Sequence, residues 1–148
     1  MPTNKTVPVT PSQDDDQFES PVRVTGPRAR IVSAELVFAA VEYAGEGVVI
    51  TDTDGSILYV NPAFERITGY SSHEAIGRNP RFLQGEHCQA DFCRNLWETV
   101  QAGQVWAGRF TNCHKDGQLY QIDATIAPIR DVTGTIIAIV VMLRSLPA

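Results

Sequence analysis

The chain has 148 residues, of which 43% are hydrophobic and 20% charged. These values predict one globular domain with a buried core and exclude two domains of ordinary size. Twelve Lys and Arg against 17 Asp and Glu give a net charge of −5, which argues against nucleic acid or an anionic membrane as partner. No apolar run approaches the roughly 18 residues of a membrane span, and the N-terminus has no apolar signal-peptide core. We therefore expect a cytoplasmic protein.

The three cysteines, Cys88, Cys93 and Cys113, are an odd number and lack the spacing of a metal site. We expect free thiols in a reducing cytosol and no bound metal.

The composition of the chain changes at Arg30. Residues 1–29 hold five prolines and an acidic run, so they cannot bury enough apolar surface to offset their ordering entropy and are expected to form a flexible tail. Residues 30–44 form a flanking segment, with a helix predicted over Ile31–Tyr43. That helix is apolar around most of its circumference and needs burial on more than one side. We expect it to contribute to a homodimer.

A strand, a turn and a second strand follow, over Val48–Asp52 and Ile57–Val60. Asn61 is a good N-cap and Pro62 suits the first helical position, so a short helix is predicted up to Ile67, closed by Gly69. The next predicted elements are a helical turn from Ser72 to Gly77, a connecting segment over Arg78–Gly85 broken by Pro80, and a longer helix over Gln89–Gln101.

Three further strands are predicted over Val105–Cys113, Leu119–Ile129 and Thr135–Leu143, separated by Asp- and Gly-containing turns. Apolar and polar residues alternate in the second of them, which indicates one buried and one polar sheet face. The fold class is therefore α+β, with a five-stranded antiparallel sheet, helices on one face enclosing a ligand cavity, and an additional N-terminal helix. The folded domain is placed at residues 45–146.

The motifs of this domain resemble those of the PAS superfamily of sensory domains. The resemblance runs from about Glu46 to Arg144. The residues that carry it are Gly47–Asp52 with Asp54-Gly55, Tyr59–Phe64, Thr68–Tyr70, Glu74, Gly77, Lys115–Gly117 and Ala127–Ile129.

The stretch Gly77–Gln84 is also similar to the signature of the flavin-binding light-oxygen-voltage (LOV) domains. In that family, a cysteine within the signature forms a light-driven covalent bond with the flavin. Pro80 stands at this position and has no thiol, so the usual cysteinyl adduct cannot form here.

The resemblance implies a set of flavin-contacting positions. Asn79 and Gln84 match contacts to the ribityl chain, Arg81 a phosphate contact, and Asn112 a contact to the ring edge. Three positions depart from the family. This chain has Ile122 where the family has a second ring-edge asparagine, Leu143 near the position of a ring-contacting glutamine, and Trp97 where the family has a second phosphate-binding arginine. From the residues alone, Arg81 could be solvated, Asn79 and Gln84 could cap helices, and Trp97 could belong to the core.

The region from Leu96-Trp97 to Ala127-Pro128 is similar to the FAD-containing PAS domains of the NifL and MmoS type, which regulate nitrogen fixation and sense methane-oxidation conditions. Those domains also lack the LOV cysteine and have tryptophan at the position of Trp97. This similarity favours FAD over FMN, with the indole packed against the dinucleotide.

No nucleophile with a base at a motif spacing, glycine-rich phosphate loop or motif-placed carboxylate pair is present, so we predict no enzymatic activity. We predict a sensory input module that binds a flavin and reports redox state or light to a downstream signalling domain or partner protein. The alternatives are a cofactor-free PAS module for dimerisation and signal relay, and a sensor of a small metabolite. Both alternatives are supported by Ile122 and Leu143, since apolar residues at these two positions make the cavity less polar than that of a LOV domain.

Overall fold

The computed structural model describes residues 33–87 and 89–147. The described residues belong to two units, which are divided between Val41 and Glu42. The predicted tail at 1–29, the start of the flanking segment and Cys88 lie outside the described residues.

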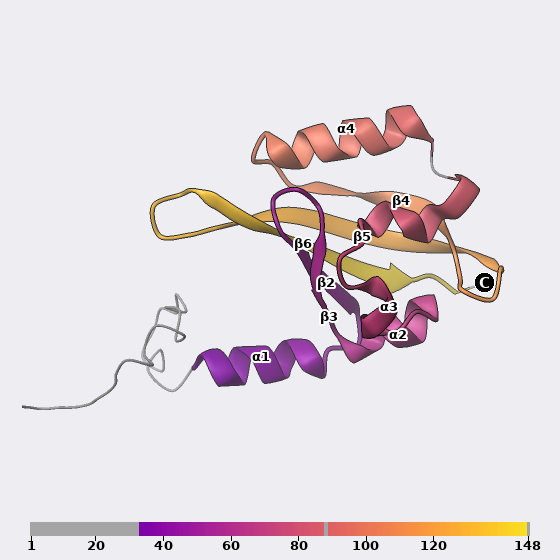
Figure 1. Ribbon diagram of the computed structural model, residues 1–148, viewed down its shortest axis with the longest axis horizontal. Helices are drawn as coiled ribbons and strands as arrows, with labels where there is room; N and C mark the ends of the chain where they lie inside the picture. The colour runs from indigo at the N-terminus through magenta and orange to yellow at the C-terminus, as the bar shows by residue number, and fades with distance from the viewer. Residues whose placement is uncertain (1–32, 88, 148) are drawn as a thin grey trace, which may run out of the picture. The chain divides into compact units, whose positions relative to one another are not determined.

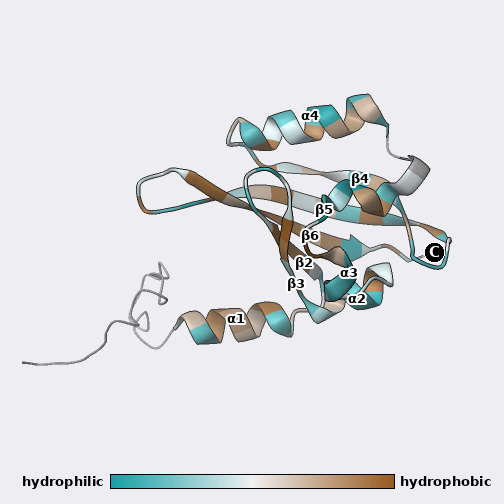
Figure 2. Cartoon of the chain, in the orientation of Figure 1, coloured by the Kyte–Doolittle hydropathy of each residue, from teal (hydrophilic) through white to brown (hydrophobic). Residues whose placement is uncertain are grey.

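Helix α1 spans Ala34–Glu42, which is shorter at both ends than the predicted Ile31–Tyr43. It begins after Ser33, whose hydroxyl accepts a hydrogen bond from the backbone N–H of Leu36 at 3.1 Å. None of its residues is buried, and it is apolar along most of its length, as Figure 2 shows. The amphipathic stripe of an ordinary surface helix is therefore absent from α1.

The second unit is built on a five-stranded antiparallel sheet, which confirms the predicted fold class (Figure 1). The strands are β2 (Gly47–Thr51), β3 (Ile57–Val60), β4 (Trp106–Cys113), β5 (Leu119–Arg130) and β6 (Ile136–Ser145), in the spatial order β3-β2-β6-β5-β4. The first strand in sequence, β2, therefore pairs with the last, β6, inside the sheet, where Val49 lies opposite Val141.

The turn between β2 and β3 is held by Asp52. Its carboxylate accepts hydrogen bonds from the backbone N–H groups of Asp54 and Ser56, both at 2.9 Å. Gly55 has a φ of 90°, which a residue with a side chain rarely adopts. The turn thus explains Asp52, while the side chain of Asp54 has no role in it.

Helix α2 (Pro62–Thr68) is positioned by Asn61, which is fully buried. The Asn61 side chain accepts hydrogen bonds from the backbone N–H of Phe64 at 3.0 Å and of Val48 at 2.8 Å, and donates one to the carbonyl of Glu46 at 3.0 Å. One amide therefore caps a helix and ties it to the start of β2. Gly69 ends the helix in the left-handed region, as predicted.

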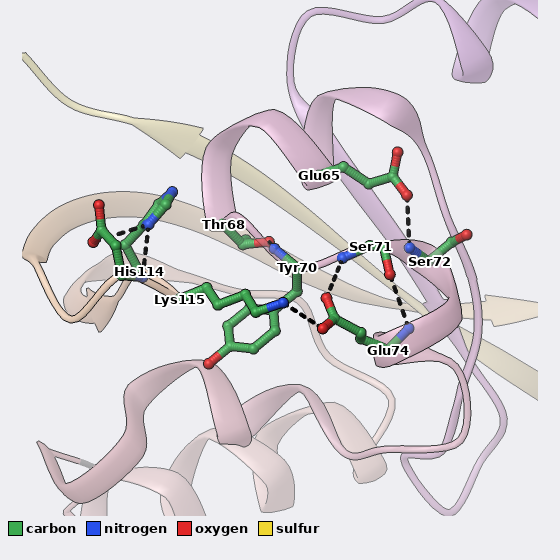
Figure 3. A network of polar contacts seen from close by, with 9 residues as sticks. Glu65, Thr68, Tyr70, Ser71, Ser72, Glu74, His114 and Lys115 are labelled. Carbon is green, nitrogen blue, oxygen red and sulfur yellow. Dashed lines mark hydrogen bonds and ion pairs between the residues drawn. The ribbon is translucent and has the colours of Figure 1, made fainter.

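Helix α3 (Ser72–Ala75) is fixed by a capping box between Ser71 and Glu74. Figure 3 shows that the Glu74 carboxylate also accepts a hydrogen bond from Lys115 Nζ, on the hairpin between β4 and β5. The backbone N–H of Lys115 donates to the carbonyl of Thr68 at 3.0 Å. The hairpin is thereby attached to the corner between α2 and α3.

We expect this attachment to be pH-dependent. The hydrogen bond from Lys115 and the backbone N–H of Ser71 hold the pKa of Glu74 below its usual value. Because the folded-state pKa is lowered, the contribution to stability is present above the ordinary carboxyl pKa and is lost as the pH falls through the lowered one. Lys115→Gln should raise the pKa of Glu74, measured by carboxyl-carbon NMR.

The internal control is Asp131, whose pKa is lowered by hydrogen bonds from Thr133 and not by a lysine. Its titration should be the same in both proteins. An unchanged Glu74 titration in Lys115→Gln would contradict the role given to this lysine.

The predicted connecting segment over Arg78–Gly85 is wrong in part, because the chain forms the 3₁₀ element η3 (Pro80–His87) there. Pro80 suits the first position of such a helix, since it needs no N–H donor there. Helix α4 (Ala90–Gln101) follows and packs against β4 and β5. Its Val100 is fully buried, as its apolar spacing predicts.

The core lies between the sheet and these helices. Its fully buried members include Val49, Phe64, Val100, Ile122 and Leu143. In β5, the buried positions alternate with partly exposed ones, which confirms the predicted two-faced strand.

Candidate functional site

A cavity of about 600 Å³ lies on the helix side of the sheet, within the range of small-molecule sites. Strands β2, β4, β5 and β6 form its floor, and η3 and α4 form its opposite wall. The lining residues are Val49, Thr51, Asp54, Asn79, Pro80, Arg81, Leu83, Gln84, Ala90, Cys93, Arg94, Leu96, Trp97, Phe110, Asn112, Ile126, Ile139, Val141 and Leu143.

One polar side chain in the floor is unsatisfied. Asn112 on β4 is only 1% exposed, and neither its Nδ2 nor its Oδ1 makes a hydrogen bond within the described residues. Leaving a buried amide unpaired costs about 1–3 kcal/mol for each group, so native proteins rarely do so without a partner. An amide that faces a cavity in this state is prepared to bind a polar ligand group.

Tyr120 lies opposite Asn112 in the β4–β5 ladder. Its hydroxyl is also buried and without a hydrogen bond of good geometry. Burial raises the pKa of this phenol, and the neighbouring Asn112 opposes the rise. The phenol is therefore neutral at physiological pH and can serve Asn112 as a polar neighbour without adding charge to the cavity.

The structure brings six of the seven predicted site residues around this cavity: Asn79, Arg81, Gln84, Trp97, Asn112 and Leu143. The seventh, Ile122, is fully buried in the core and does not line the cavity. Asn79 also caps η3 locally, because its Oδ1 accepts from the backbone N–H of Arg81 at 3.0 Å.

Trp97 lies against the turn between β2 and β3. A Cβ added to Gly55 would stand 3.1 Å from the Trp97 ring and 2.6 Å from Asn79 Nδ2. The absence of a side chain at Gly55 thus allows the hairpin to approach α4 and η3 at one side of the cavity. Trp97 serves both as a packing residue and as cavity wall.

We expect Gly55→Ala to lower the free energy of unfolding by about 2–3 kcal/mol, measured by urea denaturation, through backbone strain and the close contacts combined. Gly134→Ala is the matched control: Gly134 has a φ of 89°, and a Cβ there would meet nothing within 4 Å. That control should lose only the strain component of about 1 kcal/mol. Equal losses in the two variants would show that the contact with Trp97 and Asn79 carries no energy.

One exposed lining residue, Arg94, is missing from the predicted set. It stands three residues before Trp97, so the two occupy neighbouring positions on one face of α4. The helical spacing from Trp97 is the signal that identifies it, whereas the resemblance to LOV domains places the family's arginine at Trp97 itself.

Trp106 packs with Phe92 and Phe110, with ring centroids 5.6 and 5.9 Å away.

The expectation of three free thiols is wrong for Cys93, which is disulfide-bonded. The expectation rested on the redox environment of the cytosol. A disulfide also depends on whether the fold brings two sulfur atoms together, which that reasoning does not address. Cys113 is free. Within the described residues, no group of three or more His, Cys, Asp or Glu could hold a metal ion.

Sheet order, helix placement and cavity together define an α+β domain with a cavity between its sheet and its helices. The family model described as PAS domain matches residues 45–146. The chain therefore belongs to the PAS domain family. Within residues 33–87 and 89–147, no helix is long and apolar enough to cross a membrane.

Three similar proteins illustrate the relationship. The nitrogen fixation regulatory protein of Klebsiella oxytoca is 34% identical over 111 residues, which cover 75% of this chain and 22% of that protein. The blue-light photoreceptor of Listeria monocytogenes is 33% identical over 100 residues, covering 66% of this chain and 40% of that protein. A LOV domain studied with a flavin analogue superposes with a TM-score of 0.67 at 28% identity, covering 76% and 85%. The matched region thus spans less than half the length of the Klebsiella and Listeria proteins.

Proposed function

We propose that this PAS domain is a sensory input module that binds a flavin in the cavity, with FAD favoured over FMN. It reports redox state or light without a cysteinyl adduct, because Pro80 lines the cavity where the LOV family has its reactive thiol. The observation that carries the proposal is the unsatisfied amide of Asn112 in the floor of a cavity of suitable size.

The lining fits a flat ring with a polar edge and a polar tail. Apolar side chains from β2, β5 and β6 form most of the floor, namely Val49, Ile126, Ile139, Val141 and Leu143. Asn112 supplies a donor and an acceptor to the edge of the ring. Gln84, on η3, and Asn79, just before η3, can bind the hydroxyl groups of the tail. With Leu143 lining the cavity where the LOV family has a glutamine, Asn112 is the side chain of the sheet that supplies the polar ring-edge contact.

A flavin would supply blue absorption and reversible redox chemistry at its ring. The chain's contribution is the Asn112 side chain, which can present either Oδ1 or Nδ2 to the ring edge by rotating. Such a rotation would disturb Tyr120 across the ladder and thereby β5. This is a local hydrogen-bond change of the kind that sensory domains convert into a signal.

The multidomain relatives support the role of an input module. The nitrogen fixation regulatory protein and the blue-light photoreceptor are both longer than the region that matches this chain. We infer that this domain likewise acts on a downstream signalling domain or a partner protein in the cytoplasm, and that it catalyses no reaction of its own.

We also infer a homodimer formed through the N-terminal helix and the sheet. On α1, Leu36 is 53% exposed. On β6, the positions that alternate with the cavity-lining residues are apolar as well: Ala138, Val140 and Met142. Leu36→Glu should convert the dimer to monomer in sedimentation equilibrium, since a charge would be buried without a partner. A dimer of unchanged affinity would contradict the role of the helix.

The experiment for the flavin is the visible absorption spectrum of the purified full chain, followed by denaturation and chromatography of what it releases. A flavin band in the blue and release of FAD are expected, and illumination should bleach the band only by photoreduction. A colourless protein that takes up no added flavin would overturn the proposal. It would favour the cofactor-free relay module, to which the apolar Leu143 in the cavity floor already points.

A further inference from the structure

The disulfide-bonded cysteine of this chain stands in the wall of the cavity. Cys93 lies near the start of α4, is half-buried and lines the cavity, and its sulfur is bonded to a second sulfur. Of the three cysteines in the sequence, Cys113 is free. This leaves Cys88, five positions before Cys93 and outside the described residues, as the candidate partner within the chain.

The position of this disulfide suits reversible reduction. Because Cys93 is half-buried and its neighbour Arg94 is exposed, a thiolate in solution has a route to the sulfur, and accessible disulfides are the readily exchanged ones. A bond between positions 88 and 93 closes a short loop, which constrains the unfolded chain less than a long loop does. Reduction should therefore leave the fold intact.

A buried amide is placed to respond to the state of this sulfur. Gln84 on η3 is only 6% exposed, and its Oε1 lies 3.4 Å from Cys93 Sγ. A disulfide sulfur carries no proton, whereas a thiol is a weak hydrogen-bond donor. Reduction thus gives Oε1 a donor that the disulfide does not offer, and a buried amide orients toward the partners available to it.

Gln84 also stands between two hollows of the protein. It lines the main cavity of about 600 Å³ and, with Phe110, a second hollow of about 220 Å³. The other residues of the second hollow are Gln89, Phe92 and Thr111. A rotation of the Gln84 amide therefore changes the polar lining of both spaces.

We propose that the Cys93 disulfide is a reversible thiol-redox site, and that Gln84 transmits its state to the cavity. The reductant is a dithiol. One of its thiolates attacks a sulfur of the disulfide, the S–S bond breaks and one cysteine leaves as a thiol. The second thiolate then displaces the other cysteine. Two electrons and two protons pass to the cysteine pair, and the dithiol leaves as a disulfide.

This inference goes beyond the proposed function, because it gives the domain a redox input that needs no flavin. In a reducing compartment such as the proposed cytoplasm, a disulfide of this kind forms when conditions become oxidising. To that extent alone the inference rests on the proposed location. Both tests below use the full chain freed of bound flavin.

The first test maps the thiols by mass spectrometry. The folded protein is incubated with or without dithiothreitol, desalted, and alkylated in urea. Without dithiothreitol, Cys113 should be alkylated and Cys93 should not. After dithiothreitol, Cys93 should be alkylated as well, with an unchanged circular dichroism spectrum. Alkylation of Cys93 without reductant, resistance of its disulfide to dithiothreitol, or unfolding on reduction would each overturn the proposal.

The second test follows the side-chain amide of Gln84 by NMR. Its resonance should shift on reduction and return on reoxidation with oxidised glutathione, whereas the exposed amide of Gln101 at the end of α4 should not move. Cys93→Ser should abolish the response, and the matched variant Cys113→Ser should retain it.

An unchanged Gln84 resonance, or a response that is lost in Cys113→Ser, would refute the role given to these residues. The two proposals can fail separately. A chain that binds flavin but shows no thiol-dependent shift refutes only the thiol switch. A chain that binds no flavin but shows the shift refutes only the flavin site.

Discussion

Asn61→Ala is expected to lower the free energy of unfolding by about 3–5 kcal/mol, a large part of the stability of a domain of this size. The substitution removes three buried hydrogen bonds at once, to Phe64, Val48 and Glu46. The backbone N–H of Val48 and the carbonyl of Glu46 lose this partner at the junction of β2 and α2, while the N–H of Phe64 keeps its bond to the backbone carbonyl of residue 61 at 3.1 Å. The change should be measured by urea denaturation followed by circular dichroism.

The matched control is Asn95→Ala, which deletes an exposed amide on α4 and should change the free energy of unfolding by less than about 0.5 kcal/mol. A small effect at Asn61 as well would mean that water replaces its hydrogen bonds. The position would then not organise the fold in the way described above.

Asn112→Leu is expected to have opposite effects on stability and on ligand binding. In the free protein, an apolar side chain of similar size removes an unsatisfied buried amide and should raise the free energy of unfolding by about 1–2 kcal/mol. In the same variant, flavin affinity should fall about tenfold or more, because the ring edge loses its polar contact. Urea denaturation without ligand and a flavin fluorescence titration measure the two effects.

Asn95→Leu, at the exposed position on α4, controls for the general effect of adding an apolar side chain and should change neither quantity appreciably. If Asn112→Leu destabilised the free protein, the amide would be satisfied there and not reserved for a ligand. If flavin affinity were unchanged, the ring edge would lie elsewhere.

The strands and caps of this domain are predictable because they depend on local chemistry. Asn61, Pro62 and Gly69 define α2 from sequence alone, since each occupies the one position that its side chain or backbone favours. Alternation in β5 is equally local, and its period of two assigns the buried face. The cap made by Asn61 has a long-range part, however. Its bond to Val48 joins groups that sequence reasoning does not place together.

The site is less predictable because it depends on which side chains meet across elements. Resemblance to LOV domains points to six residues that do line one cavity, but also to Ile122, which the strand register directs into the core. Arg94 is absent from that resemblance because the family's arginine corresponds to Trp97. Only the packing of α4 against the sheet shows that Arg94, a neighbouring position, lines the same cavity.

The most direct measurement for the central claim is the NMR signal of the Asn112 side-chain amide as FAD is added to the full chain. This resonance is expected to shift and to saturate at one equivalent, because the amide gains the partner that it lacks in the free protein. The exposed Asn95 amide should not move. A saturable FAD complex in which the Asn112 amide stays unchanged, or no complex at all, would contradict the assignment of this cavity as a flavin site.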